Sequence, residues 1–343
     1  MSRIKVNTIK DAAGTGTVDL EDDLQVDGVV VSSANTYDYY DQAGTPSSPK
    51  NGAIWWNDPT LKIYVNDAWK TLSYTTLGGP WTFDVDDVGA TSSQVSHNSH
   101  WGGIVTGTVF SPDGLKHYYS SSGGPIQFAD LTTGFDLSTF DGTQDYVYYN
   151  YPSLSGFVDV ELNDDGTKIY VLRSSSTDGI YAVDMSTAYD LSTASVANEF
   201  LDVSTQTTSP NWMEFHPDGD VVFIGGGTSV YKYTLTTAWD VSTGSYSNTS
   251  VSLTQSGVST WKYGFFDANG AKIYLLDFSG KKLYQANLTT PWDISTASMT
   301  SLTPADLAYS IYNIYSVNPR TDDGSEIYVQ NSNRQWVVYP TNN

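Results

Sequence analysis

The sequence predicts an all-β protein, in which a small β-rich N-terminal module precedes a five-bladed β-propeller covering about three-quarters of the chain. Three observations lead to this prediction. The composition favours strands and turns, two sequence elements recur together about every 53 residues, and one isolated copy of the second element precedes the repeats. A period near 50 residues, with about four strands in each copy, is typical of propeller blades.

The composition supports strands rather than helices. Aromatic residues make up 14% of the 343 residues, led by 25 Tyr and 10 Trp, and such residues favour strands and the spaces between packed sheets. The 29 glycines suit many tight turns. No stretch carries a sustained apolar stripe with a period of 3.6 residues, so we expect almost no helix.

The charge and the residue usage exclude several classes of protein. Sixteen basic against 38 acidic residues give a net charge of −22, which repels nucleic-acid phosphates and anionic membranes. The absence of cysteine excludes a disulfide framework and a thiolate nucleophile. The first residues have no apolar signal core, and the longest aliphatic run is Val29–Val31, so we expect a soluble protein made in a cytosol.

The first repeated element is a hairpin. It reads DGTKIYV or a variant, with Asp-Gly or Asn-Gly before a β-rich run, and this pair favours a hairpin because both residues tolerate positive φ. Successive hairpin glycines lie 52, 53, 51 and 54 residues apart. These glycines are Gly114, Gly166, Gly219, Gly270 and Gly324.

The second repeated element is an aromatic residue followed by Asp and Ser-Thr, as in LTTAWDVST. We expect the aromatic ring to pack on a neighbouring sheet and the Asp to accept hydrogen bonds from local backbone N–H groups, as a turn former rather than a catalytic group. The aromatic residues lie 54, 50 and 53 residues apart. They are Phe135, Tyr189, Trp239 and Trp292.

The fifth blade is expected to combine both ends of the repeat region. No aromatic element follows Gly324, whereas an isolated copy, LGGPWTFDV, contains Trp81, 54 residues before Phe135. We therefore expect residues 74–96 to complete a blade with residues 313–343, which removes exposed sheet edges. A hidden sixth blade is the alternative. The other four repeats lie near 97–154, 155–209, 210–259 and 260–312.

The first 73 residues do not follow the repeat. Residues 1–35 contain a short hairpin at Asp27-Gly28 and are too few to bury a core alone, so we expect a docking or oligomerisation segment. Residues 36–73 predict three short strands, AIWWN, LKIYV and AWKTL. Their aromatic residues form either a local core or a carbohydrate-stacking face. These residues are Trp55 or Trp56, Tyr64 and Trp69.

Several segments resemble a known family. The opening KVNTIKDAAGTGTVDL and the stretch GTPSSPKNGAIWWNDPTLKIYVNDAWKTL resemble tail-fibre-like virion proteins of tailed bacteriophages, and the propeller repeat resembles repeats of phage fibres and bacterial surface proteins. The resemblance implies a structural or adhesive protein, often trimeric, whose N-terminal part docks on the particle. It implies no catalytic residues.

Four histidines and one acidic cluster were considered as ligands. His97 and His100 form an HxxH pair, which suits either a metal site repeated around a trimer axis or a polar loop. His117 and His216 fall at hairpin positions where other repeats hold different residue types, which predicts tolerated surface positions.

The acidic cluster, Asp84, Asp86 and Asp87, could hold Ca²⁺ but lacks the EF-hand spacing. Glycoside hydrolysis needs two or three carboxyls in one cleft, and no pair stands out among 38 acidic residues. We therefore identify no catalytic, metal-binding or cofactor-binding residue.

These observations lead to a functional hypothesis. We expect a phage virion structural protein, assembled in the host cytoplasm, which docks on other virion proteins through residues 1–73 and forms a homo-oligomer, with a trimer favoured. The propeller would meet a host-surface glycan or protein, without nucleic-acid binding or membrane insertion. The alternatives are a glycan-binding lectin without a docking role and a glycan-degrading propeller enzyme.

Overall fold

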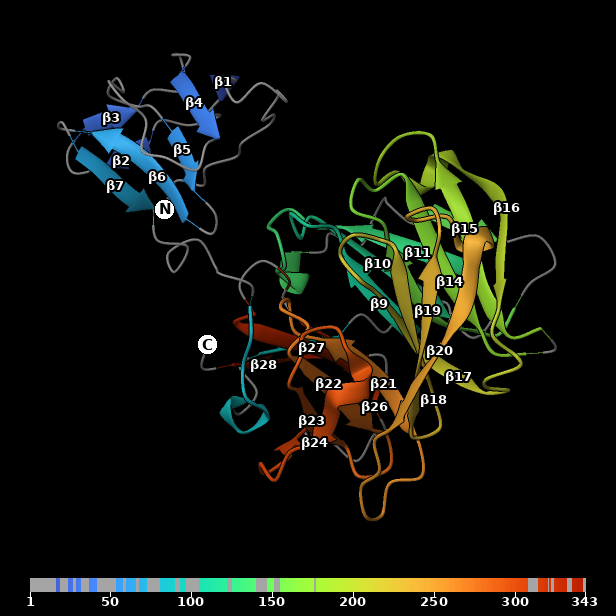
Figure 1. The fold of residues 1–343 in the computed structure, drawn as a ribbon. Helices are drawn as coiled ribbons and strands as arrows, with labels where there is room; N and C mark the ends of the chain where they lie inside the picture. Colours follow the sequence, from blue (N-terminus) through green and yellow to red (C-terminus); the bar gives the residue numbers. More distant parts are fainter. Residues whose placement is uncertain are drawn as a thin grey trace. The chain divides into compact units, whose positions relative to one another are not determined.

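The computed structural model divides the chain into two compact units, Met1–Gly79 and Pro80–Asn343 (Figure 1). Side chains are described for 81–89, 105–120, 126–139, 155–175, 177–307, 314–319, 321, 324–331 and 335–341. For the strands of the first unit, and for 93–96, 121, 125 and 147–150, the backbone alone is described. Among the described residues, no helix is long and apolar enough to cross a membrane.

The N-terminal unit contains a five-stranded sheet and a separate hairpin. The sheet has the order β1-β4-β5-β6-β7, formed by Thr17–Val18, Tyr37–Asp41, Ile54–Asn57, Thr60–Val65 and Ala68–Leu72. The hairpin pairs β2 (Leu24–Val26) with β3 (Val29–Val31). The strands predicted around Asp27-Gly28 and from AIWWN to AWKTL are therefore confirmed. The predicted aromatic face lies outside the described side chains.

The second unit is a five-bladed propeller, as the repeat predicted. Blade 1 consists of β9 (Val105–Phe110), β10 (Lys116–Ser121), β11 (Pro125–Asp130) and β12 (Val147–Asn150). Blade 2 consists of β13 (Phe157–Leu162), β14 (Lys168–Arg173), β15 (Gly179–Met185) and β16 (Ala194–Asp202). Blade 3 consists of β17 (Pro210–Phe215), β18 (Val221–Gly226), β19 (Ser229–Leu235) and β20 (Gly244–Ser252).

The last two blades are less regular. Blade 4 consists of β21 (Trp261–Phe266), β22 (Lys272–Asp277), β23 (Lys282–Leu288) and β24 (Ala297–Met299), and β25 (Ala305–Asp306) also pairs with β23. Blade 5 consists of β26 (Ile314–Pro319), β27 (Glu326–Asn331), β28 (Gln335–Pro340) and β8 (Ser93–Ser96). Single 3₁₀ turns precede the outer strands of the blades. They are η2 (Val85–Asp87), η3 (Leu137–Thr139), η4 (Leu191–Thr193), η5 (Val241–Thr243) and η6 (Ile294–Thr296).

The ring closes as the sequence predicted. The first strand of each blade contacts the first strand of the next, and β26 of blade 5 contacts β9 of blade 1. Strand β8, from the segment before the repeats, pairs antiparallel with β28 and places Val95 opposite Trp336. The edge of β28 is therefore covered by a segment more than 200 residues away in the sequence.

The hairpin glycine and the aromatic residue of the same blade form one structural unit. All five hairpin glycines have φ between 63° and 71°, which L-residues adopt only at a cost. In blade 3 the Trp239 ring lies over Gly219, and the Trp239 N–H donates to the Gly219 carbonyl at 2.9 Å. Trp239 itself has a φ of 63°. The same arrangement recurs in blades 1, 2 and 4, around Phe135, Tyr189 and Trp292.

A tyrosine hydroxyl joins each of four blades to the next. Tyr170 of blade 2 donates to the carbonyl of Trp239 in blade 3 at 2.6 Å. Equivalent bonds run from Tyr118 to Tyr189, from Tyr274 to Phe83 and from Tyr328 to Phe135. The donor lies on the second strand of one blade and the acceptor in the aromatic element of the following blade.

These bonds correct one sequence alignment. The residue equivalent to Phe135 in blade 5 is Phe83 rather than Trp81, because Phe83 accepts the bond from Tyr274 and the next residue, Asp84, is the N-cap of η2. Trp81 lies two residues earlier, and its ring packs beside Phe265 at 6.3 Å. The stretch WTFDV holds two aromatic residues, so spacing alone selected the wrong one.

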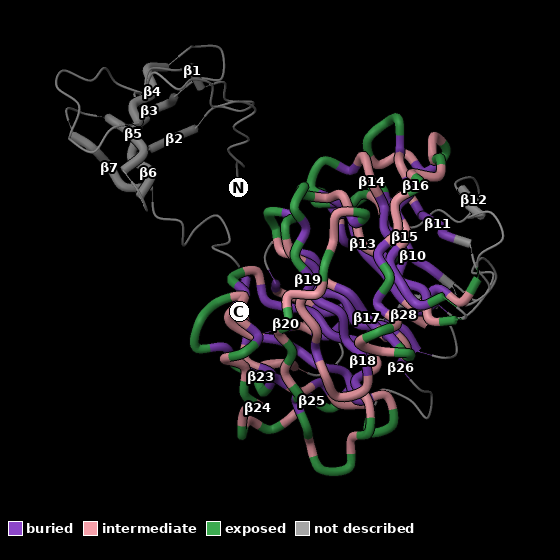
Figure 2. Tube along the Cα trace, turned by 45° about the vertical axis from the view of Figure 1, so that its right-hand side comes forward, coloured by how far each residue is buried: buried purple, intermediate pink, exposed green. Residues whose placement is uncertain are grey.

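The core follows the sheets. Buried residues run along the strands, and exposed residues gather in the connections (Figure 2). The largest fully buried side chains include Trp212, Trp261 and Trp336. Large aromatic residues suit these positions because two twisted sheets leave wide spaces between them.

The overlap of glycine and aromatic ring can be tested with Gly219→Ala. A Cβ at Gly219 would lie 2.2 Å from Trp239 Cε2, so the change adds a steric clash to the cost of positive φ. The matched control is Gly227→Ala, which has a φ of 60° but nothing within 4 Å of the added Cβ. Urea unfolding should show a loss of about 1 kcal/mol for Gly227→Ala and at least twice that for Gly219→Ala. Equal losses would contradict the proposed overlap.

Candidate functional site

The histidines considered from the sequence have different environments. His97 and His100 lie outside the described residues. His117 was expected at the surface, and this is wrong: its side chain is buried between blades 1 and 5, stacked on Phe110 at 4.3 Å and edge-on to Trp336 at 4.8 Å. Its position is buried because residues at this point of blade 1 face the closing blade. His216 is half-buried and lines a pocket described below.

The acidic cluster Asp84, Asp86 and Asp87 is not brought together as a metal site. Asp84 accepts from Gln285 Nε2 at 2.9 Å and pairs with Lys272 Nζ at 2.9 Å. The bonds from Gln285 and Lys272 hold the pKa of Asp84 below its ordinary value. In the part of the chain that the structure describes, no group of three acidic, His or Cys residues has the geometry to hold a metal ion.

The aspartates of the aromatic elements are turn formers, as predicted. Asp240 Oδ1 accepts from the Ser242 backbone N–H at 3.0 Å and from its hydroxyl at 2.6 Å. Asp136, Asp190 and Asp293 make the same pair of bonds. These bonds fix the turn that precedes the outer strand of each of these blades.

Three carboxyl groups gather on the innermost strands of blades 2 and 3. Asp159 is fully buried on β13 and accepts from the Met213 N–H at 2.7 Å and the Val160 N–H at 2.9 Å. Glu161 follows two residues later, and Glu214 lies on β17; both side chains are half-buried. Sequence analysis did not single out these residues, because only the ring brings the two strands together.

Burial dominates the electrostatics of this axial acidic cluster (Asp159, Glu161 and Glu214). Burial raises the pKa of Asp159 to about 8, although the Met213 and Val160 N–H groups oppose the shift. Burial also raises the pKa of Glu161 and of Glu214, and the neighbouring carboxyls add to both shifts. Lys262 and the Tyr263 hydroxyl are the opposing groups near Asp159.

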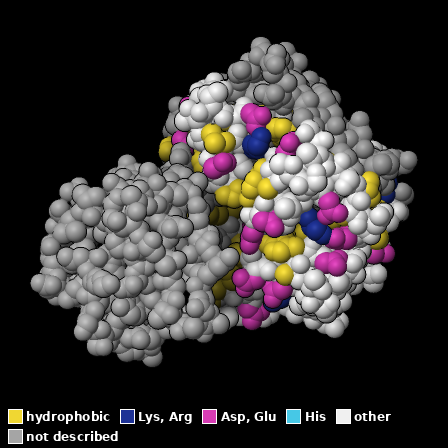
Figure 3. Space-filling model, turned by 90° about the horizontal axis from the view of Figure 1, so that it is seen from above, with side chains coloured by type: hydrophobic (Ala, Val, Ile, Leu, Met, Phe, Trp, Pro, Cys, Tyr) yellow, Lys and Arg dark blue, Asp and Glu magenta, His cyan; other side chains and the backbone are white. Residues whose placement is uncertain are grey.

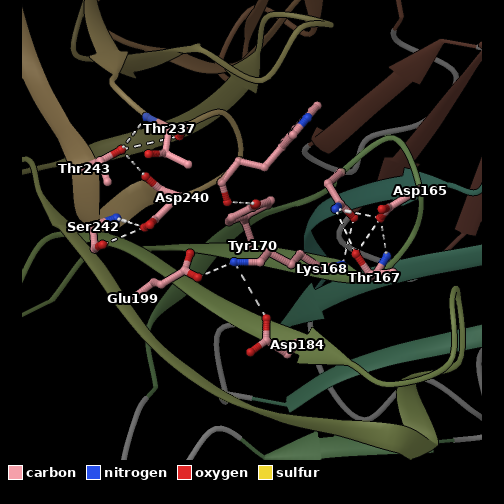
Figure 4. A network of polar contacts seen from close by, with 12 residues as sticks. Asp165, Thr167, Lys168, Tyr170, Asp184, Glu199, Thr237, Asp240, Ser242 and Thr243 are labelled. Carbon is pink, nitrogen blue, oxygen red and sulfur yellow. Dashed lines mark hydrogen bonds and ion pairs between the residues drawn. The ribbon is translucent and has the colours of Figure 1, made fainter.

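The grooves between adjacent blades are a second place where polar side chains meet. In three blades, a lysine at the first residue of the second strand forms ion pairs. Lys168 of blade 2 lies between Glu199 and Asp184, as Figure 4 shows, with 3.7 Å between its Nζ and Asp184 Oδ1. Lys116 pairs with Asp130 at 2.5 Å in blade 1, and Lys272 of blade 4 pairs with Asp84.

The groove between blades 3 and 4 is hollowed. It forms a pocket of about 420 Å³. Blade 3 contributes His216, Asp220, Val221, Lys232, Thr234, Ser247 and Thr249, and blade 4 contributes Pro291, Trp292 and Asp293. The His216 ring stands edge-on to the half-buried Trp292 ring, with 4.8 Å between centroids. The pocket thus combines an aromatic wall with hydroxyl, carboxyl and amino groups.

Hydrogen bonds favour the charged form of Asp293 at this pocket. The hydroxyl and backbone N–H of Ser295 hold the pKa of Asp293 below its ordinary value, and Lys232 adds to the effect. Both bonds from Ser295 go to Oδ1, so Oδ2 can accept from a ligand. Across the face of the protein in Figure 3, acidic side chains are more frequent than basic ones, in keeping with the net charge of −22.

Sequence analysis recognised only part of this site. The sequence predicts a tolerated surface position for His216 and a packing role for the Trp292 ring. Two differences between the repeats could have indicated the site. Val221 stands where three other blades have lysine, and Phe223 stands where the four other blades have tyrosine. Each departure alone is an ordinary substitution, and only the structure places them in one groove.

Comparisons with known proteins assign this chain to no family. No protein-family model matches the chain, and no curated protein sequence matches it. Among solved structures, the chain is similar to a nidogen/laminin complex, with 12% identity, a TM-score of 0.42 and coverage of 79% of this chain and 81% of that chain.

Two other structures are similar at the same level. A putative 6-phosphogluconolactonase from Bacteroides uniformis has 14% identity and a TM-score of 0.42, covering 66% of this chain and 64% of its own. Kuenenia stuttgartiensis hydrazine synthase has 14% identity and a TM-score of 0.39, covering 69% of this chain and 59% of its own. At such values no function passes from these proteins to this chain.

The axial acidic cluster makes stability depend on pH. Its carboxyl groups have raised pKa values in the folded protein, so the folded chain holds more protons than the unfolded chain between about pH 4 and pH 8. The free energy of unfolding should therefore fall from pH 5 to pH 8. Glu214→Gln removes one ionising group and should reduce this fall by about 1 kcal/mol.

Urea unfolding at pH 5, 6, 7 and 8 measures the effect. Glu199→Gln is the control, because Glu199 pairs with Lys168 in a groove away from the innermost strands. Its stability should follow the pH dependence of the unmodified chain. A Glu214→Gln protein whose stability falls as steeply as that of the unmodified chain would contradict the assignment.

Proposed function

We propose that this chain is a fibre-like structural protein of a tailed-bacteriophage virion, which docks through its N-terminal unit and presents the propeller for host-surface recognition. The resemblance of the opening residues and of the stretch from residue 44 to residue 72 to tail-fibre-like proteins supports the identity of the particle. The fold supports the presenting role, since a propeller offers rigid faces and grooves on which binding residues vary without changing the scaffold.

The observation that carries the proposal is the self-contained ring. The propeller closes with residues 81–96, whose strand β8 pairs with β28, and the chain before them forms a separate compact unit. None of the strands described in residues 1–79 belongs to a blade. A separate unit that the propeller does not need is suited to attachment.

The small size of the N-terminal unit also favours assembly. Units of this size bury little apolar surface by themselves and are commonly stabilised by association. We propose that the unit forms a homo-oligomer, with a trimer favoured, and contacts other virion proteins. The chain would then be assembled into virions in the host cytoplasm.

Deletion of residues 1–73 tests the docking role. The shortened chain should keep the propeller fold, because all described strands of the five blades lie after residue 80. It should be absent from purified virions, as measured by immunoblotting of particles produced with the shortened gene. The full chain with Asp218→Asn, a change at an exposed hairpin position, should be incorporated normally. Incorporation of the shortened chain at normal copy number would exclude the docking role.

A glycan-degrading enzyme is the second candidate, and the axial acidic cluster favours it. Glycoside hydrolysis uses two carboxyl groups, one of which keeps its proton near neutral pH, and Glu161 and Glu214 are half-buried with raised pKa values. Asp159 is less suited to a catalytic role, because its oxygens accept two backbone N–H groups.

Release of reducing ends from host surface polysaccharide would identify the enzyme. The activity should fall at least about 100-fold in both Glu161→Gln and Glu214→Gln, the order of loss expected when an acid–base group is removed. The Glu199→Gln protein should keep full activity. No release of sugar by the unmodified chain leaves recognition as the function of the propeller.

A further inference from the structure

The pocket between blades 3 and 4 lies where blade 3 has no counterpart of a partly exposed ion-pair network in blade 2. In blade 2 the strand register places Lys168 opposite Asp184, and Glu199 completes the network. The same register in blade 3 places Val221 opposite Thr234. Thr249 follows the positive-φ residue Asn248, just as Glu199 follows Asn198. Three charged side chains of blade 2 therefore correspond to smaller, uncharged ones in blade 3.

Two further changes in the same groove remove the recurring partner of a carbonyl group and introduce an amino group. Phe223 has no hydroxyl, so the Trp292 carbonyl lacks the tyrosine bond that the equivalent carbonyl receives in each of the other four blade pairs. Lys232 stands opposite Phe223, and its Nζ lies 6.0 Å from the Phe223 ring centroid. Within the described part of the chain, no carboxylate lies within 4.0 Å of this amino group.

The histidine is also turned differently from its equivalents. In blades 2 and 4, the side chains of Asn163 and Asp267 accept from the first N–H of the second strand at 2.8 and 3.0 Å. His216 instead accepts from the Asp218 N–H at 3.1 Å through Nδ1, and its ring faces Trp292. This orientation leaves Nε2 available as a hydrogen-bonding group.

We propose that this pocket binds one pyranose residue of a neutral saccharide. The apolar C–H face of a sugar ring suits Trp292 and Pro291, and its hydroxyl groups suit the carboxylates of Asp220 and Asp293 and the hydroxyl of Thr249. The volume of about 420 Å³ falls in the range of small-molecule sites, which is roughly 300–1,000 Å³. The inference rests on the proposed function, since it names the ligand class that the propeller would recognise.

Charge selects this ligand class. A polyanionic chain would approach a protein with a net charge of −22 and meet Asp220 and Asp293 in the pocket, with one lysine to oppose them. A single neutral sugar uses the hydroxyl and carboxyl groups without introducing a charge.

The test uses the full chain and ligand-observed NMR. The probes are the methyl glycosides of glucose, galactose, mannose and N-acetylglucosamine, with glucuronate as the charged probe. At least one neutral glycoside should bind, and glucuronate should bind at least tenfold more weakly. The filled variant carries Val221→Lys, Thr234→Asp and Thr249→Glu, which together introduce the side chains of the blade 2 groove, and it should lose binding at least tenfold.

A matched pair of single changes covers the case in which the filled variant fails to fold. Asp220→Asn alters a pocket carboxylate and should weaken binding at least threefold, whereas Asp218→Asn alters the neighbouring carboxylate of the same hairpin, outside the pocket, and should leave it unchanged. Binding that is equal in both single variants, or absent for all four glycosides at about 100 mM, would overturn the inference. Preferential binding of glucuronate would overturn it too.

Adsorption to host cells separates this inference from the proposed function. If the filled variant is folded and adsorbs like the unmodified chain, the propeller still recognises the host and the pocket assignment is wrong. If the unmodified chain binds a neutral glycoside through the pocket but virions lack the protein, the pocket stands and the virion role fails.

Discussion

The propeller depends on the contact between a hairpin glycine and an aromatic ring of the same blade. The glycine has no Cβ, so the ring can lie directly on its backbone, and the aromatic residue tolerates its own positive φ because its N–H donates to the glycine carbonyl. The ring then stands at the boundary with the preceding blade. The carbonyl of the aromatic residue accepts a tyrosine hydroxyl from that blade in three cases, at Phe135, Tyr189 and Trp239. One local contact therefore determines both the turn within a blade and the spacing between blades.

Variation is accommodated around this contact rather than in it. Blade 5 has no positive-φ aromatic residue over Gly324, and Thr341 donates to the Gly324 carbonyl instead. Blade 3 keeps its own glycine and tryptophan but changes the residues that fill the groove toward blade 4. A groove can lose its ion pairs while the ring stays closed, because the aromatic contacts on either side are independent of them. The scaffold and the candidate binding site are thus separable in the sequence.

The sequence predicted the fold better than the sites, because each repeated pair of elements corresponds to one blade. Two elements at a common spacing were enough for the blade count, the turn-forming aspartates and the closure of the ring. The alignment of Trp81 failed where two aromatic residues stood two positions apart, and three-dimensional bonding was needed to choose Phe83. The axial acidic cluster and the pocket were missed because their members come from different repeats. His117 was misplaced for a similar reason, since its burial depends on a blade formed by distant residues.

The segment that enters the propeller is bonded to two blades in succession. Trp81 and Phe83 contact blade 4 through Ala268, Tyr274 and Lys272, and β8 then pairs with β28 of blade 5. A mechanical load arriving from the N-terminal unit therefore meets the side-chain and backbone bonds to blade 4 before it reaches the outer strand of the closing blade. The order of these bonds along the chain therefore places the anchorage to blade 4 ahead of the strand pair that closes the ring.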